Sequence, residues 1–138
     1  MYPIELVRPM IQELNSSGFE SLTTSDEVIN KLSKKDGTSL LVVNSVCGCA
    51  AAYARPGVTM ALKGDHKPDQ LLTVFAGVDT EATAKAREFL LPYPPSSPAI
   101  ALFKEGRLVH MLERHHIEGR SAQMIADNLS MAFNNYCN

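Results

Sequence analysis

The sequence predicts an α/β fold in which helices cover both faces of a mixed sheet of about five strands. Two short apolar runs, 39–44 and 71–76, are rich in Leu and Val and bounded by turn formers, as is typical of strands buried on both faces. Helical patterns alternate with these runs, which favours a mostly parallel sheet. Two later apolar runs, 99–103 and 108–112, flank the turn 104–107 and predict a closing antiparallel hairpin.

The first two helices are predicted from apolar spacing and capping residues. Residues 3–16 carry Val, Met, Ile and Leu at helical spacing and end in a cluster of Asn, Ser and Gly. A short extended piece is expected at 19–22. Thr24 and Glu27 form a capping-box pattern that opens the second helix, and the turn 34–37 ends it.

Three more helices are predicted after the first central strand. The Ala-rich residues 50–54 begin one of them directly after the first central strand, and Pro56 with Gly57 is expected to interrupt it. Asp79 is the predicted N-cap of a helix that runs through Leu90. Apolar residues at helical spacing place the last helix near the C-terminus.

Size and charge restrict the class of protein. With 138 residues and no Ser/Gly-rich linker, the chain is expected to form one domain, residues 1–138. Its 13 Lys+Arg and 15 Asp+Glu give a formal net charge of −2, without the clustered basic charge that binds nucleic acid or an anionic membrane. No apolar run approaches the roughly 20 residues that span a bilayer, and the charged, Pro-containing first ten residues do not resemble a signal peptide. We expect a cytoplasmic protein without nucleic-acid or membrane partners.

A close pair of cysteines carries the clearest chemical signal. Cys47 and Cys49 lie at the junction of a predicted strand and a predicted helix. The unpaired N–H groups and partial positive charge of a helix start favour a thiolate at Cys47, and Cys49 in the first turn is the natural resolving thiol. Gly48 is expected to remove a Cβ that would crowd so tight a loop. A disulfide across one residue should be strained and easily reduced, which predicts a redox function.

Two other interpretations of the pair are open. Free cysteines are often buried simply as small apolar residues. A metal site would need further ligands, and the candidates are Cys137, His110, His115 and His116, although zinc sites normally space their cysteines C-x₂₋₄-C. His115 and His116, which lie among charged residues after a strand, are more typical of a solvated polar turn.

Several blocks of sequence together resemble the bacilliredoxin family of thioredoxin-fold proteins. They are NSVCGCA at 44–50, ARP at 54–56, TVFAG at 73–77, ATAK at 82–85, PSSP at 95–98 and the penultimate Cys137. These blocks extend over nearly the whole chain and are far more specific in combination than a bare C-G-C. The resemblance implies a thioredoxin-like three-layer α/β/α sandwich. It also implies a cytoplasmic thiol–disulfide oxidoreductase that removes bacillithiol, the glucosamine–malate–cysteine thiol of some bacteria, from protein cysteines.

The resemblance also implies roles for particular residues. Cys47 would attack the mixed disulfide and take up bacillithiol, and Cys49 or a second bacillithiol molecule would clear it. Ser97-Pro98 directly precedes a predicted strand, and in thioredoxin-like sheets a cis-proline loop faces the redox cysteines, so we expect a cis bond and a substrate-binding role there. Cys137 is a candidate accessory thiol, or else a packing residue that closes the last helix. The exchange itself needs no metal or organic cofactor, and the expected partners are bacillithiol and S-bacillithiolated proteins.

Two alternative functions are retained. One is a protein disulfide isomerase or reductase, an activity that is also associated with the family in weak form. The other is a non-enzymatic metal- or metabolite-binding domain on a thioredoxin-like scaffold. Arg55 is expected to be solvated, with added positive potential near a thiolate as the alternative role.

Overall fold

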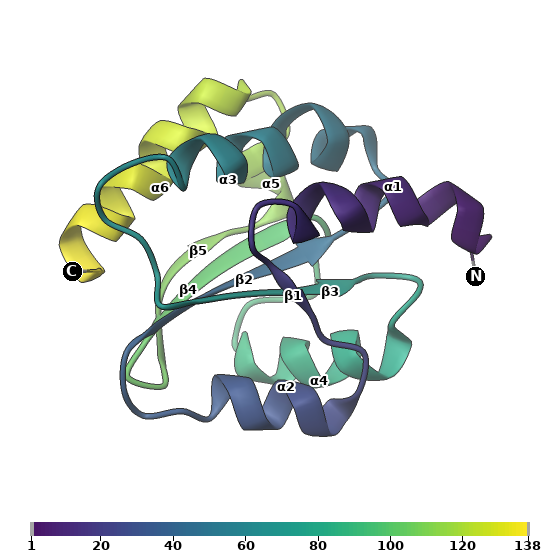
Figure 1. The fold of residues 1–138 in the computed structure, drawn as a ribbon, viewed down its shortest axis with the longest axis horizontal. Coiled ribbons are helices and arrows are strands. Elements are labelled where there is room, and N and C mark those ends of the chain that lie inside the picture. The colour runs from purple at the N-terminus through teal and green to yellow at the C-terminus, as the bar shows by residue number, and fades with distance from the viewer. Residues whose placement is uncertain (1, 138) are drawn as a thin grey trace.

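A mixed five-stranded sheet forms the middle layer of the structure, a computed structural model that describes residues 2–137 (Figure 1). Its strands are β1 (Glu20–Ser21), β2 (Thr38–Asn44), β3 (Gln70–Phe75), β4 (Ala99–Lys104) and β5 (Arg107–Leu112). They lie in the order β1-β3-β2-β4-β5. β1, β3 and β2 are parallel, whereas β4 pairs antiparallel with β2 and β5 antiparallel with β4.

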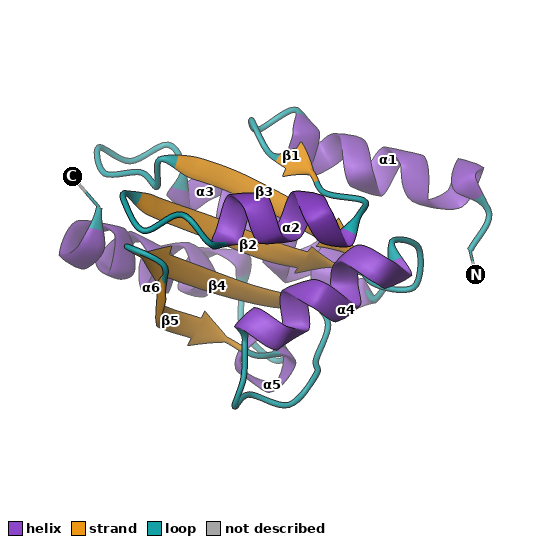
Figure 2. Ribbon diagram, turned by 90° about the horizontal axis from the view of Figure 1, so that it is seen from below, coloured by secondary structure: helices purple, strands orange, loops and turns teal. Residues whose placement is uncertain are grey.

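Helices cover both faces of this sheet. One face carries α1 (Ile4–Asn15), η1 (Ala50–Ala54), α3 (Arg55–Ala61) and α6 (Ala122–Tyr136), and the other carries α2 (Ser25–Leu32) and α4 (Thr80–Phe89) (Figures 1 and 2). Along β2 the buried side chains alternate between two apolar clusters. Leu40 and Val42 pack with the first group of helices, and Leu41 and Val43 pack with the second. The predicted three-layer sandwich, with its mixed sheet and closing hairpin, is confirmed.

The predicted capping box is present at α2, and Asp79 is the N-cap residue of α4 as predicted, although without a side-chain cap. The Thr24 hydroxyl accepts the Glu27 backbone N–H at 3.2 Å, and a Glu27 carboxylate oxygen accepts the Thr24 N–H at 3.1 Å. Asp79 precedes α4 as expected, but its side chain makes no cap hydrogen bond and instead accepts the Phe75 N–H at 3.1 Å. The carboxylate therefore closes the turn after β3, and burial raises its pKa.

The helix after β2 is irregular at a different place from the one expected. Pro56 and Gly57 do not interrupt it, because both lie within α3. The irregularity comes one turn earlier in η1, a π-helical turn whose widened hydrogen bond runs from the Arg55 N–H to the Ala50 carbonyl. Proline has no N–H and its ring clashes with the carbonyl four residues before it, so a widened turn is a reasonable way to accommodate Pro56 without ending the helix.

The sheet topology brings two distant segments to one edge. In the antiparallel β2–β4 pair, Val43 near the end of β2 lies opposite Ala99 at the start of β4. The residues that follow β2 and the residues that precede β4 therefore meet beyond the same end of the sheet. These are the C-G-C segment and the proline-rich loop 91–98.

Candidate active site

Cys47 directly precedes the first helical residues after β2, at the predicted strand-to-helix junction. Gly48 and Cys49 are the first helical residues, and the Ala50 N–H donates to the Cys47 carbonyl at 2.9 Å. Both cysteines are free thiols and half-buried. The expected reason for Gly48 is wrong: a Cβ there would meet no atom within 4 Å. Steric crowding in the reduced loop therefore does not require a glycine.

The surroundings of Cys47 favour its thiolate. Burial alone raises the pKa of a thiol, but here hydrogen bonds from the Cys49 thiol and backbone N–H outweigh it, and the pKa of Cys47 is lowered. The Cys49 N–H lies 3.3 Å from the Cys47 sulfur. The positive charge of Arg114 lowers the pKa further. Of the two thiols, Cys47 is the one whose thiolate these contacts favour.

Cys49 has the opposite protonation preference. Its hydrogen bond to Cys47, followed by burial and the negative charges of Cys47 and Glu118, raises its pKa. The Cys49 thiol also lies 3.7 Å from a Glu118 carboxylate oxygen, to which it donates a hydrogen bond. The contacts therefore favour the thiolate at Cys47 and the thiol at Cys49, the asymmetry expected of an attacking and a resolving cysteine.

A short helix that the sequence did not predict supplies the two charges beside the cysteines. Residues 114–117 form α5 (Arg114–Ile117) where a polar turn was expected. Arg114 Nε donates to Glu118 Oε1 at 2.6 Å, so the two side chains form an i,i+4 ion pair. The only sequence signal was this spacing of opposite charges, which is common on exposed helices. Sequence reasoning therefore missed Arg114 and Glu118 as functional residues.

The loop before β4 has the expected cis peptide and contacts the same arginine. The Ser97–Pro98 bond is cis, as predicted, and a second cis bond at Leu91–Pro92 was not predicted. The Ser97 carbonyl accepts from Arg114 Nη1 at 3.3 Å, and Ser96 Oγ accepts the Arg114 backbone N–H at 3.3 Å. Arg114 thus links the cis-proline loop to the cysteine pair.

Arg55 is buried and hydrogen-bonds to residues just before the C-G-C motif, contrary to the expectation that it is solvated. Arg55 is only 3% exposed. It donates to Asn44 Oδ1 at 2.9 Å, to the Ser45 carbonyl at 3.0 Å and to Glu13 Oε1 at 2.8 Å. Asn44 Oδ1 in turn accepts the Ser45 N–H, and Ser45 Oγ accepts the Cys47 N–H at 2.9 Å. This chain of hydrogen bonds positions the segment that carries the nucleophile.

An open cleft of about 450 Å³ lies beside Cys47. Its lining includes Ser45, Cys47, Gly77, Arg87, Ser97 and Arg114. A separate hollow of about 350 Å³ between β5 and α6 includes His116 and Met124 in its lining but neither cysteine of the pair. The first cleft is the candidate substrate site because Cys47 lines it.

Cys137 lies far from this cleft. It is 4% exposed and packs in the apolar cluster beneath α6. Burial raises its pKa, while hydrogen bonding with Thr38 partly opposes that effect. Thr38 begins β2 and Cys47 follows its end, so roughly 20 Å of strand separates the two thiols. The structure thus agrees with the packing interpretation and does not bring the candidate accessory thiol to the cysteine pair.

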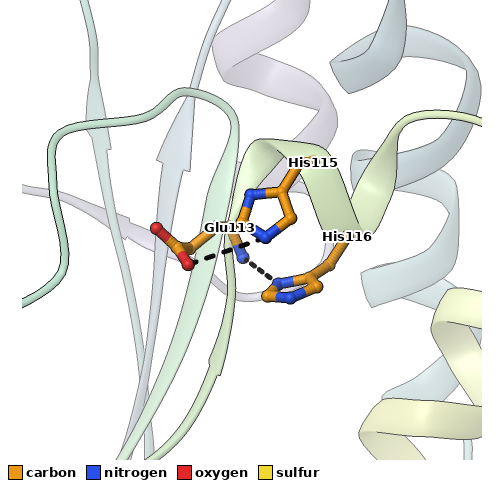
Figure 3. Close-up of side chains that lie close together, drawn as sticks. All are labelled: Glu113, His115 and His116. Carbon is orange, nitrogen blue, oxygen red and sulfur yellow. Dashed lines mark hydrogen bonds and ion pairs between the residues drawn. The ribbon is translucent and has the colours of Figure 1, made fainter.

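Three residues with metal-binding side chains, Glu113, His115 and His116, cluster at the start of α5 (Figure 3). His116 Nδ1 accepts the Glu113 N–H at 3.0 Å, and the Glu113 side chain accepts a backbone N–H from the first turn. These atoms therefore cap the helix. His110, the remaining histidine candidate, bonds Asn128 at 2.6 Å. The histidines and the cysteine pair do not form the joint site that the metal interpretation required.

Comparison with known proteins defines the class in two steps. The thioredoxin of Malassezia sympodialis superimposes with a TM-score of 0.58 at 14% identity, covering 84% of this chain and 88% of that one. Oxidised mitochondrial thioredoxin 3 of Saccharomyces cerevisiae gives 0.55 at 18%, covering 86% and 96%. The fold is therefore thioredoxin-like. Together with the bacilliredoxins found among the sequence relatives, it defines a thiol–disulfide oxidoreductase.

Sequence relatives then identify the family. The model of the disulphide isomerase family matches residues 2–137. A bacilliredoxin of Cytophaga hutchinsonii is 62% identical over 133 residues, which cover 96% of this chain and 98% of that protein. A bacilliredoxin of Halalkalibacterium halodurans is 49% identical, with 99% and 94% covered. The chain belongs to the bacilliredoxin family. Within the part of the chain that the structure describes, no helix has both the length and the hydropathy of a transmembrane span.

Proposed function

We propose that this protein removes bacillithiol from S-bacillithiolated proteins, with Cys47 as nucleophile and Cys49 as resolving thiol. The observation that carries the proposal is the opposite shift of the two thiol pKa values, lowered at Cys47 and raised at Cys49, in a cleft bounded by the cis-proline loop. The names of the relatives, which are bacilliredoxins, support bacillithiol as the small thiol.

The reaction proceeds by two thiol–disulfide exchanges. The Cys47 thiolate attacks the bacillithiol sulfur of the mixed disulfide, the S–S bond breaks, and the repaired protein leaves as a thiolate that takes a proton from solvent. Cys49 then loses its proton and attacks Cys47, which forms the Cys47–Cys49 disulfide and releases bacillithiol. A second bacillithiol molecule could attack in place of Cys49 and leave as bacillithiol disulfide.

The environment assigns a role to each neighbour in these steps. Arg114 stabilises the attacking thiolate, and the Glu118 carboxylate keeps Cys49 protonated until Cys47 carries the adduct. Both exchanges require only thiols, so we propose no metal or organic cofactor. We place the reaction in the cytoplasm, where the reducing poise keeps such thiols free.

The test is the intact mass of a Cys49→Ala variant after mixing with a bacillithiolated peptide. We expect an adduct with the mass of bacillithiol at Cys47, because the resolving thiol is absent. A Cys47→Ala variant is the matched control and should form none. No adduct on the Cys49→Ala protein would contradict the proposal.

Protein disulfide isomerisation is the second candidate, favoured by the description of the matching family model. It predicts that Cys47 attacks the peptide sulfur instead. The same experiment then yields a peptide adduct on Cys47 and free bacillithiol, so the mass of the trapped species separates the two functions.

A further inference from the structure

Two arginines line the cleft beside Cys47 in a protein whose formal net charge is −2, and one of them, Arg114, is paired with Glu118. Two guanidinium groups line it, those of Arg87 and Arg114, and no carboxylate is among its lining residues. The two arginines come from different elements, the end of α4 and the start of α5. They therefore meet only because the fold brings both helices to the Cys47 end of the sheet.

Arg87 has no partner that explains its position. Its Nε is buried without a hydrogen-bond partner, and its side chain makes no hydrogen bond or ion pair with any residue of 2–137. A buried donor without a partner is costly, since its hydration is lost and nothing replaces it. Because Nε is out of reach of the cleft, a ligand there would bind the terminal nitrogens of Arg87, Nη1 and Nη2, which also have no hydrogen-bond partner within residues 2–137.

Arg114 is held in place by the protein and retains donor capacity. Its Nε is bound by Glu118 and its Nη1 by the Ser97 carbonyl, whereas Nη2 has no hydrogen-bond partner within residues 2–137. A guanidinium whose other nitrogens are fixed is preorganised for a carboxylate, which it binds with little further loss of side-chain entropy. Arg114 also acts on the Cys47 thiolate, so a ligand there lies beside the reacting sulfur.

We infer that Arg87 and Arg114 form a carboxylate-binding subsite that holds the malate group of bacillithiol while its sulfur reacts with Cys47. This inference rests on the proposed function and adds the reason for which bacillithiol is selected. Malate carries two carboxylates, and the subsite offers two guanidinium groups. The sugar hydroxyls of the same ligand need only neutral partners, such as Ser45 at the same cleft.

The experiment compares two adducts on one neutral peptide, bacillithiol and 2-mercaptoethanol. For each protein, kcat/KM on each adduct is divided by the rate at which dithiothreitol reduces that adduct, which corrects for intrinsic reactivity. The ratio of the two corrected values measures selection of the carboxylate-bearing thiol. We expect Arg87→Gln to lower this ratio about tenfold, the effect of losing one charge-assisted hydrogen bond at a partly exposed site. The loss should appear mainly in KM.

Three controls make the outcome decisive. Arg107→Gln, an exposed arginine in the hairpin at the far end of the sheet, should retain the wild-type ratio. Arg87→Lys should lower this ratio less than Arg87→Gln does, because a positive charge remains. The pH profile of Cys47 alkylation in Arg87→Gln should match that of the wild type, which shows that thiol reactivity is intact and that the protein is folded.

The subsite and the proposed function fail in different ways. A wild-type protein that does not reduce the bacillithiol adduct contradicts the proposed function, and one that reduces both adducts with equal corrected kcat/KM overturns the subsite alone. If the wild-type protein selects the bacillithiol adduct and the Arg87→Gln variant keeps the same ratio, the subsite alone is overturned. Equal losses on both adducts, or a shifted alkylation profile, would also overturn it, since Arg87 would then act on structure or on the thiol.

Discussion

At the scale of single residues, the two active-site thiols differ through their neighbours and not through their own chemistry. Cys47 receives a backbone N–H and the positive charge of Arg114, whereas Cys49 donates to Glu118. The same ion pair therefore acts with opposite sign on sulfurs that are two positions apart. The proposed roles of Cys47 in attack and Cys49 in resolution rest on that asymmetry.

The asymmetry predicts a pH dependence for alkylation. Only the thiolate reacts, so the rate at each cysteine rises with pH and levels off above its pKa. Because the pKa of Cys47 is lowered and that of Cys49 is raised, the Cys47 curve should level off at the lower pH. Iodoacetamide labelling followed by peptide mass spectrometry measures both curves, and coincident curves would contradict the assignment.

Glu118→Gln should reduce this difference. The substitution removes the negative charge that raises the pKa of Cys49 and frees Arg114 from its partner. We expect the alkylation curve of Cys49 to shift toward lower pH, by up to about one unit for the loss of one neighbouring charge. Glu88→Gln, at an exposed ion pair on α4, is the matched control and should leave both curves in place.

At the scale of elements, the packing of α3 on α6 explains the Pro56-Gly57 dipeptide better than a helix break does. A Cβ at Gly57 would lie 2.7 Å from Ile125 Cγ2 and 3.1 Å from the Ala122 carbonyl oxygen. Gly57 thus permits close approach of two helices on the face that also carries η1. Because of the π-helical turn, the helix accommodates Pro56 and still packs against α6.

Gly57→Ala should therefore destabilise the protein despite the higher helix propensity of alanine. We expect the free energy of unfolding to fall by about 2 kcal/mol, as is typical of overpacking in a close helix contact. Urea denaturation measures it. Gly48→Ala is the control, because a Cβ at that helical position meets no atom within 4 Å and stability should be unchanged or slightly higher. Equal stability of the two variants would refute the packing argument.

At the scale of the whole molecule, Arg55 joins parts of the chain that are far apart in sequence. Its guanidinium contacts Glu13 of α1, Asn44 at the end of β2 and the Ser45 carbonyl in the C-G-C segment. The ion pair with Glu13 is screened on one side, since Glu13 is 41% exposed. The hydrogen bonds to the buried acceptors are therefore the larger contribution.

Arg55→Met should remove those hydrogen bonds while filling most of the space. We expect a loss of about 2–3 kcal/mol in the free energy of unfolding, the range for hydrogen bonds from a charged donor to buried acceptors. Urea denaturation measures this loss, and Arg107→Met, at an exposed arginine, is the control. Because the network positions Cys47, the exchange rate should fall as well, and an unaffected rate would show that the loop holds its geometry without Arg55.

Cys137 should behave as a core residue. Its burial and raised pKa both oppose thiolate formation, so alkylating agents should label it only after unfolding, while Cys47 is labelled in the native protein. Labelling with and without urea, read by peptide mass spectrometry, tests this. Rapid labelling of Cys137 in the native protein would contradict this prediction and make Cys137 a candidate accessory thiol again.

Much of the fold could be predicted because it depends on short stretches of chain. The expected strand 39–44 is observed as Thr38–Asn44, and the capping box at Thr24 is present. The predictions that failed involve choices that local sequence leaves open. Whether the residues after β5 form a turn or a helix depends on what packs against them, and so does the choice of the Asp79 side chain between the helix start and the turn after β3.

By itself, the sequence determined the succession of strands and helices and the placement of Cys47 where β2 meets a helix. Propensity, capping and apolar spacing act over a few residues, so they can be read along the chain. Only the tertiary structure decided which charges surround that thiol. Arg87, Arg114 and Glu118 lie far from Cys47 in sequence, and the burial and partners of the nearer Arg55 arise only when the sheet and its two helical layers are packed together.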